Sequence, residues 1–170
     1  RQNGLYGLGR NYRNLQFDEL KAVSLSLHKA SRRAHDEGPS ETAVQLARKY
    51  GADETLAARA GILHDLTKAL SGAEQIEFCR IHGIPVSEEE WENPGILHGK
   101  TAAWCAREIF GECEEICSAI EFHTTGRADM TLLEKIIYIA DYVEPTRDFP
   151  GVAALREAVW RDLDEGVLLG

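Results

Sequence analysis

Hydrophobic side chains recur every three or four positions through most of this chain, which is the spacing of amphipathic helices. The first such segment begins at Phe17, and Leu20, Val23 and Leu27 continue it on one face. Alternating apolar and polar positions, which would indicate strands, do not occur. A buried strand is a competing interpretation only for "KIIYIADYV", which is rich in β-branched and aromatic side chains. The pattern predicts an all-α chain.

Helix caps and glycines divide this pattern into seven or eight helices. Pro39 fits the start of the second helix, with Ser40 or Thr42 as its cap, and Gly51 fits its end. Asp53 is expected to cap the third helix, and a capping box is expected before "LLEKIIYIADYV". A loop with a short acidic turn is expected over residues 84–95. The expected helices are 17–27, 39–50, 54–70, 71–82, 98–110, 112–123, 131–144 and 152–169.

The length of 170 residues suits one domain with a single core, which we expect over residues 17–170. Residues 1–16 are rich in Gly, Asn and Arg, so we expect a flexible leader or linker there. No apolar run approaches the roughly 18 residues of a membrane helix. The start of the sequence does not show a signal-peptide pattern either. Neither a membrane nor secretion is therefore expected.

The formal charge of −9 argues against non-specific binding to nucleic acid, which requires a basic surface. It leaves room for a small anionic substrate if a metal and a few Lys or Arg residues line the site. The four cysteines do not form a C-x-x-C pair, so a zinc ribbon or finger is not expected. Reduced, packed thiols in a cytoplasmic protein are the expectation.

An imidazole and a carboxylate stand side by side in "AARAGILHDLTKAL", which otherwise has the composition of a buried helix. These are His64 and Asp65, and Asp141 is an equally isolated acid within "IIYIADYV". Burying a charge is costly unless the charge is paired or binds a metal. His28 and His82 lack acidic or histidine neighbours at a useful spacing, so we assign them to the surface or to packing.

Three further histidines are expected at helix ends, where a bundle could bring them to the same centre. A mixed set of imidazole and carboxylate ligands suits Fe, Mn, Zn or Co, and open coordination positions are typical of a catalytic site. The competing interpretation is that the buried polar groups only pair with one another. The candidate ligands are His35, His64, Asp65, His98, His123 and Asp141.

The order of His35, His64–Asp65 and Asp141 resembles the HD-domain metal-dependent phosphohydrolases. Longer segments are similar to the YqeK-like branch, the symmetrical bis(5′-nucleosyl)-tetraphosphatases. They are "ETAVQLARKYGAD", "AGILHDLTK", "LHGKTAAWCAREIFG" and "FHTTGRADMTLLEKIIYIADYVEPTRDFPGV". The resemblance extends over residues 17–168.

This resemblance implies a single HD-domain helical bundle around one or two divalent metals, with iron expected and Mn or Co as alternatives. The implied reaction cleaves diadenosine tetraphosphate to two ADP. His35, His64, Asp65 and Asp141 would be the core ligands, and His98 and His123 would hold a second metal or contact phosphate. Asp65 and Lys68 would act in catalysis, with Lys68 facing the phosphates. The implied nucleotide pocket contains Thr124, Thr125, Gly126, Arg127 and Arg147.

Two alternatives stay open. One is an HD-type reaction on another nucleotide. The other is a nucleotide-binding regulatory module with a weakened metal site. The second rests on "HDEGPSETA", where related sequences resemble "HSLGVAETA", because Gly38 and Pro39 should start the helix later or kink it. A homodimer through the apolar face of the last helix is also expected to be feasible.

Overall fold

The computed structural model describes residues 11–27 and 33–170, without the side chains of residues 33–36, and all of its regular structure there is helical. The strand interpretation of residues 135–143 is wrong, because this segment lies in a helix that begins with the expected Thr131–Glu134 capping box. The helices are α1 (Phe17–Ser26), α2 (Arg33–Tyr50), α3 (Glu54–Leu63), α4 (Gly72–His82), α5 (Glu88–Glu92), the 3₁₀ helix η2 (Pro94–Leu97), α6 (His98–Glu108), α7 (Glu114–Glu121), α8 (Leu132–Val143), α9 (Val152–Arg161) and α10 (Leu163–Leu169).

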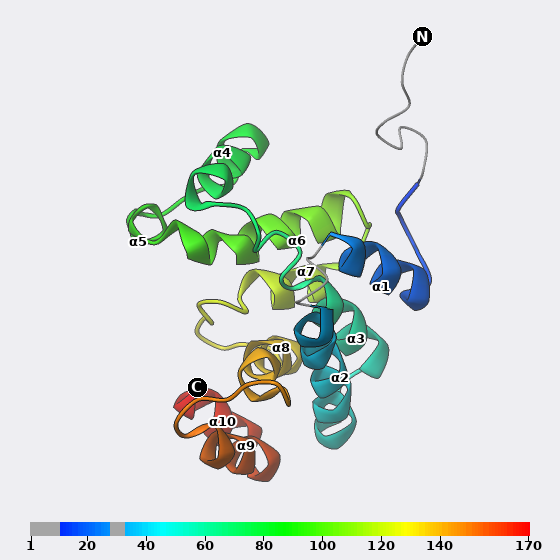
Figure 1. The fold of residues 1–170 in the computed structure, drawn as a ribbon, viewed down its shortest axis with the longest axis vertical. Coiled ribbons are helices and arrows are strands. Elements are labelled where there is room, and N and C mark those ends of the chain that lie inside the picture. The colour runs from blue at the N-terminus through cyan, green and yellow to red at the C-terminus, as the bar shows by residue number, and fades with distance from the viewer. Residues whose placement is uncertain (1–10, 28–32) are drawn as a thin grey trace.

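The core lies where α2, α3, α7 and α8 pack together (Figure 1). Leu46, Leu63, Ile120 and Ile136 come from these four helices and are fully buried. Helices α4 and α5 lie on the side of α6, whereas α9 and α10 lie beside α8 at the opposite end of the molecule. The bundle therefore surrounds the ends of α3 and α7, which carry candidate site residues.

Helix α2 begins at Arg33 and contains Pro39, so the expected start at Pro39 is wrong. The fixed φ of proline suits a helix, and its main cost is one missing hydrogen bond and crowding of the preceding turn. Tertiary packing holds this segment helical. A Cβ added to Gly61 on α3 would lie 2.6 Å from Cα of Ser40, and the Ser40 hydroxyl donates to the carbonyl of Ala58 at 2.9 Å.

Helix α3 ends at Leu63, earlier than expected, and His64 is its C-terminal cap. Tight turns follow in place of further α-helix: the N–H groups of Leu66, Lys68 and Leu70 each donate to the carbonyl three residues earlier. The short segment from residue 64 to residue 70 is called the HD turn below. Apolar residues three positions apart occur both in such turns and in an α-helix. For this reason the helix was expected to continue to residue 70.

Two other segments differ from expectation. The short acidic turn is a capped helix, α5, whose Ser87 side chain accepts from the N–H of Glu90. The last expected helix is two helices, because Asp162 is extended (φ −149°, ψ 120°). Its carboxylate accepts from the N–H groups of Asp164 and Glu165 and so starts α10 afresh.

The segment before α1 contacts the body of the protein from residue 12 onward. Leu15 is buried, and the ring of Tyr12 packs edge-on against Phe110 at 6.3 Å between centroids. Residues 1–10 of the expected leader, and His28, lie outside the described residues. None of the helices that the structure describes combines the length and hydrophobicity required to cross a bilayer.

Candidate metal centre

Three of the predicted histidines are oriented in the same way. The Nδ1 atoms of His64, His98 and His123 lie 2.7, 2.6 and 2.6 Å from the carbonyl oxygens of the residues three positions earlier, Gly61, Gly95 and Ile120. A carbonyl only accepts hydrogen bonds, so each Nδ1 must carry the hydrogen. In a neutral ring, Nε2 then holds a lone pair. Such a backbone contact is how proteins prepare a histidine to bind a metal.

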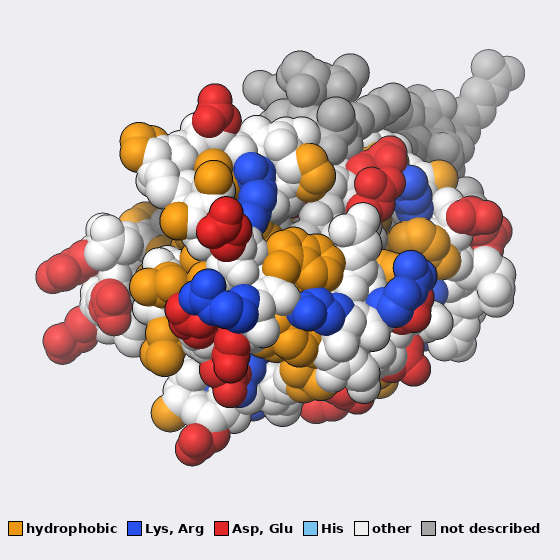
Figure 2. Space-filling view, turned by 90° about the horizontal axis from the view of Figure 1, so that it is seen from below, with side chains coloured by type: hydrophobic (Ala, Val, Ile, Leu, Met, Phe, Trp, Pro, Cys, Tyr) orange, Lys and Arg blue, Asp and Glu red, His pale blue; other side chains and the backbone are white. Residues whose placement is uncertain are grey.

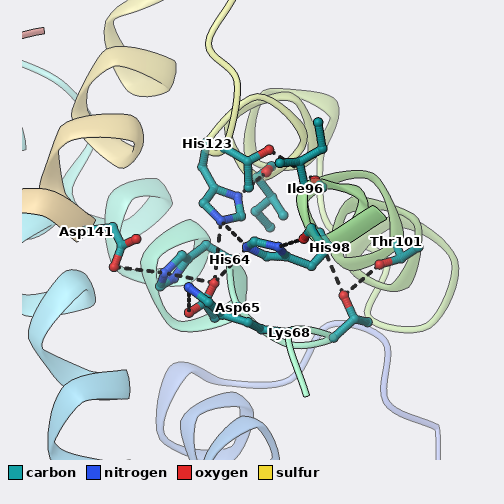
Figure 3. Close-up of polar contacts among 12 residues, drawn as sticks. His64, Asp65, Lys68, Ile96, His98, Thr101, His123 and Asp141 are labelled. Atoms are coloured by element: carbon teal, nitrogen blue, oxygen red, sulfur yellow. Dashed lines mark hydrogen bonds and ion pairs between the residues drawn. The ribbon is translucent and has the colours of Figure 1, made fainter. Parts of the chain in front are cut away.

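These three prepared Nε2 atoms converge on the carboxylate of Asp65 (Figure 3). Their distances to Oδ1 of Asp65 are 3.5 Å from His64, 3.2 Å from His98 and 3.5 Å from His123. The Nε2 atoms of His98 and His123 are 3.1 Å apart. The residues come from the end of α3, the start of α6 and the turn after α7. The structure brings these three predicted side chains together from separate helices.

The electron-rich atoms of this cluster lack sufficient partners. Within the described residues, Nε2 of His64 and both carboxylate oxygens of Asp65 are buried without accepting a hydrogen bond. Ligand atoms of His64, Asp65 and His123 all lie within 4.8 Å of one another. Buried lone pairs that face each other are stabilised by a proton or a metal ion between them. The donor set therefore fits a divalent metal of the Fe, Mn, Co or Zn type.

The pKa values of the clustered side chains also favour binding of a cation. Burial alone lowers the pKa of His64, but the carboxylates of Asp65 and Asp141 more than offset this and raise the pKa to about 9. Burial likewise raises the pKa of Asp65, but the nearby histidines and Lys68 hold it far below its usual range. Burial also lowers the pKa of His123. Positive charge is thus stabilised at His64 and disfavoured at His123, so a metal would compete with a proton on His64 and meet a neutral imidazole at His123.

Asp141 lies on α8 at the edge of the cluster, with its Oδ1 3.8 Å from Nε2 of His64. The same oxygen accepts from Arg147 at 2.5 Å, and Nε of Arg147 donates to the main-chain carbonyl of Asp141 at 2.7 Å. Burial raises the pKa of Asp141, but His64 and, to a smaller extent, Arg147 hold it well below its ordinary value. Arg147 was expected in the nucleotide pocket. In this structure it is paired with Asp141, one of the candidate metal ligands.

Lys68 follows Asp65 on the HD turn and extends to the boundary of the centre. Its Nζ is 3.1 Å from Oδ2 of Asp65, and about a third of the side chain (32%) is exposed. The ammonium can therefore neutralise Asp65 on one side and meet an anion from solvent on the other. This is the position expected for a residue that faces phosphate.

The remaining predicted ligand, His35, lies in the first turn of α2, and its side chain is outside the described residues. Helix α2 packs against α3 and α8, which carry His64 and Asp141. The assignment of His35 as a metal ligand stays a prediction. His82, assigned to the surface or to packing, is exposed and stacks on Trp104 with 3.8 Å between ring centroids.

The predicted nucleotide residues 124–127 form the turn that follows His123. The Thr124 hydroxyl donates to the carbonyl of Ile96 at 3.2 Å, whereas Thr125 is exposed. Gly126 has φ of +61°, a conformation that favours glycine. Arg127 is bound to the buried Glu134, with Nη2 2.6 Å from Oε1. Their role toward a nucleotide stays a prediction.

The groups that orient the site were not predicted from the sequence. The carbonyls of Gly61, Gly95 and Ile120 have no side-chain signature, so only the position of each histidine at a helix end could have indicated them. A buried hydroxyl–amide cluster behind the HD turn, formed by Thr67, Gln75 and Thr101, was not predicted either.

Comparison with known proteins shows the family to which a chain with this cluster belongs. The HD domain family model matches residues 35–146, which include every candidate metal ligand. The chain belongs to the HD-domain family. A protein of Halalkalibacterium halodurans named symmetrical bis(5′-nucleosyl)-tetraphosphatase is 41% identical over 135 residues, which are 79% of this chain and 72% of that protein. A Bacillus subtilis protein of the same name is 38% identical over the same shares of the two chains.

The fold of this HD-domain protein also has a solved counterpart. A crystal structure from Clostridium acetobutylicum, described as a predicted HD superfamily hydrolase involved in NAD metabolism, superposes with a TM-score of 0.87. The two sequences are 41% identical, and the match covers 91% of this chain and 82% of the other. The expectation of an all-helical HD fold is therefore confirmed.

Proposed function

We propose that this HD-domain protein is a metal-dependent hydrolase that cleaves diadenosine tetraphosphate symmetrically into two ADP. The observation that carries the proposal is the convergence of three prepared histidine Nε2 atoms on the buried carboxylate of Asp65. The relatives with 38–41% identity that are named for this reaction support the choice of substrate.

Iron is the metal we propose, with Mn or Co as alternatives, because nitrogen and carboxylate donors suit all three. His64, Asp65, His98 and His123 would hold it, with Asp141 and His35 completing a site for one or two ions. When bound, a divalent metal supplies Lewis-acid chemistry: it polarises a phosphoryl oxygen and lowers the pKa of water.

The protein's own groups would bind and orient the phosphate chain. We assign Lys68 to neutralise phosphate charge, because its ammonium lies at the solvent boundary beside Asp65. Asp65 would hold its orientation through the same ion pair. Arg147 would fix Asp141, and its exposed edge would meet a phosphate. The turn of residues 124–127 would border the nucleotide, with Arg127 contributing only the part of its guanidinium that Glu134 leaves exposed.

The proposal extends to the setting of the reaction. We place the protein in the cytoplasm, since the four cysteines are free and three of them are buried. The binding partner we propose is the nucleotide, and neither nucleic acid nor a membrane.

A homodimer is a further part of the proposal, through the face formed by α8 to α10. Trp160 and Leu132 are each 38% exposed there. Figure 2 views this end of the molecule and shows small apolar groups separated by basic and acidic side chains. Such an interface would contain both apolar and charged side chains, so the dimer should weaken as the salt concentration rises.

Light scattering after gel filtration should show a dimer that Trp160→Glu makes monomeric. A monomeric wild type would contradict it.

Both alternatives to this function are less well supported. A regulatory module with a weakened site was suggested by Gly38 and Pro39, but α2 continues through both residues. A different nucleotide substrate on the same fold is distinguished by assay.

The test is to incubate the purified protein with diadenosine tetraphosphate and Fe²⁺, Mn²⁺ or Co²⁺, and to separate the products. ADP as the only product is expected, and His64→Ala and Asp65→Ala should abolish it. His82→Ala is the matched control, because that histidine packs on Trp104 away from the cluster. AMP with ATP, or no turnover with any metal, would overturn the proposal.

A further inference from the structure

Three buried polar side chains form a closed ring behind the metal centre. Thr67 comes from the HD turn, Gln75 from α4 and Thr101 from α6, with 8%, 1% and 0% of their surfaces exposed. Thr67 and Thr101 are 2.7 Å apart between hydroxyl oxygens, Thr101 and Oε1 of Gln75 are 2.7 Å apart, and Nε2 of Gln75 is 2.7 Å from the carbonyl of Thr67. We call these residues the polar ring.

Counting hydrogens gives the ring a single direction. The amide nitrogen of Gln75 donates to the Thr67 carbonyl, so its oxygen faces Thr101 and must accept. Thr101 has only one hydroxyl hydrogen and gives it to Gln75, so its oxygen accepts from Thr67. Every member then donates and accepts in sequence. Removing one hydroxyl would leave buried partners unsatisfied, which costs more than the bond contributes.

The polar ring connects the parts of the centre that lie farthest apart in sequence. Thr67 stands between Asp65 and Lys68 on the HD turn. Its one hydroxyl hydrogen goes to Thr101 in the ring, so the main-chain carbonyl of His98, 3.2 Å away, is a neighbour that this hydrogen reaches only when it leaves Thr101. Thr101 is one helical turn after His98 on α6. The ring therefore joins the turn that presents Asp65 to the helix that presents His98.

We propose that Thr67, Gln75 and Thr101 are positioning residues that set the separation between Oδ1 of Asp65 and Nε2 of His98. These atoms are 3.2 Å apart, and both would have to contact the same ion. The main-chain hydrogen bonds of the HD turn join each N–H to the carbonyl three residues earlier. Such bonds have poorer geometry than those of an α-helix, so contacts with other helices are required to fix the turn. This inference rests on one part of the function proposed above, the metal site. It does not depend on the identity of the substrate.

The test measures metal binding without turnover. Co²⁺ added to the protein cleared of metal gives an absorption spectrum that reports affinity and geometry. Thr67→Val keeps the shape of the side chain and removes the hydroxyl, and it should weaken Co²⁺ binding by about tenfold and alter the spectrum, as loss of an orienting group does. Thr67→Ser restores the hydroxyl and should bind close to the wild-type value.

Ser40→Ala is the matched control for burial. It also removes a buried hydroxyl bonded to a main-chain carbonyl on α3, but away from the ring. It should lower the melting temperature and leave the Co²⁺ titration unchanged. If Thr67→Val lowers the melting temperature but titrates like Ser40→Ala, the ring is merely structural and the proposal is overturned.

A second variant keeps the test decisive if Thr67→Val does not fold. Gln75→Met breaks the ring from α4 without touching the HD turn, and it should weaken Co²⁺ binding in the same way. An unchanged titration would overturn the proposal. The titration also separates this proposal from the proposed reaction. If Co²⁺ binding depends on the ring but the protein does not cleave diadenosine tetraphosphate, only the proposed substrate is refuted.

Discussion

At the scale of single residues, the metal centre depends on which ring nitrogen of each histidine carries hydrogen. The main-chain carbonyls of Gly61, Gly95 and Ile120 decide this for three histidines. The sequence could indicate the histidines, because imidazoles and carboxylates are unusual beside apolar helices. It could not indicate their orientation, because any residue supplies a carbonyl.

Lys68 offers a residue-scale test that separates binding of phosphate from binding of metal. Lys68→Met removes the ammonium 3.1 Å from Asp65 while keeping most of the side-chain length. We expect kcat/KM for diadenosine tetraphosphate to fall by about a hundredfold, as when other electrostatic contacts to a transition state are removed. Co²⁺ affinity should be unchanged or higher, since a nearby positive charge is lost. Steady-state kinetics and a Co²⁺ titration check this. An unchanged kcat/KM would contradict the assignment.

The cysteines provide a prediction based on pKa. Burial raises the pKa of Cys105 and of Cys117 to about 11, which disfavours the reactive thiolate at neutral pH. Cys113 is exposed. At pH 8, iodoacetamide should modify Cys113 first, and Cys105 and Cys117 should react only at higher pH or after unfolding. Peptide mass spectrometry over time measures this. Equal rates at Cys105 and Cys113 would show that α6 opens in the native state.

At the scale of helices, local signals predicted the elements well and long-range packing explains the errors. The expected capping box correctly placed the start of α8, and the expected helix 71–82 agrees with α4 to within one residue. Pro39 misled because the contact of α2 with α3 outweighs the local preference of proline. The end of α3 at Leu63 was missed because tight turns continue its apolar spacing.

Gly61 tests how closely α2 and α3 must approach. In Gly61→Ala, the new Cβ would lie 2.6 Å from Cα of Ser40 and 3.3 Å from the carbonyl oxygen of Pro39, and both atoms belong to the main chain. The helices would have to separate, so we expect the free energy of unfolding to fall by about 2 kcal/mol. Urea denaturation measures this change.

Gly95→Ala is the control for that measurement, because a Cβ there would have no atom within 4 Å. Its free energy of unfolding should stay close to wild type. If Gly61→Ala matched this control, the close contact of the two helices would not limit stability, and a different reason would be needed for the continuity of α2 through Pro39.

At the scale of the whole molecule, the site exists only when distant helices pack. His64, His98 and His123 are far apart in sequence but lie within a few ångströms of Asp65. The sequence predicted this set from residue types and from resemblance, whereas the distances and the polar ring follow from packing that no local pattern encodes. The same packing brings together buried lone pairs that repel each other, so the fold itself should be stabilised by an ion.

Removing metal should therefore destabilise the whole protein. A metal that binds only the folded state, present at a hundred times its Kd, adds about 2.7 kcal/mol to the free energy of unfolding. For a chain of this size that corresponds to a rise in Tm of about 5–10 °C. Thermal unfolding with Co²⁺, and again after a chelator, should show this rise and its loss. His64→Ala should show neither, because Nε2 of His64 is one of the buried atoms left without a hydrogen bond within the described residues. If Co²⁺ raised the Tm of wild type and His64→Ala equally, the ion would be binding elsewhere, and the cluster around Asp65 would have to be held by protons alone.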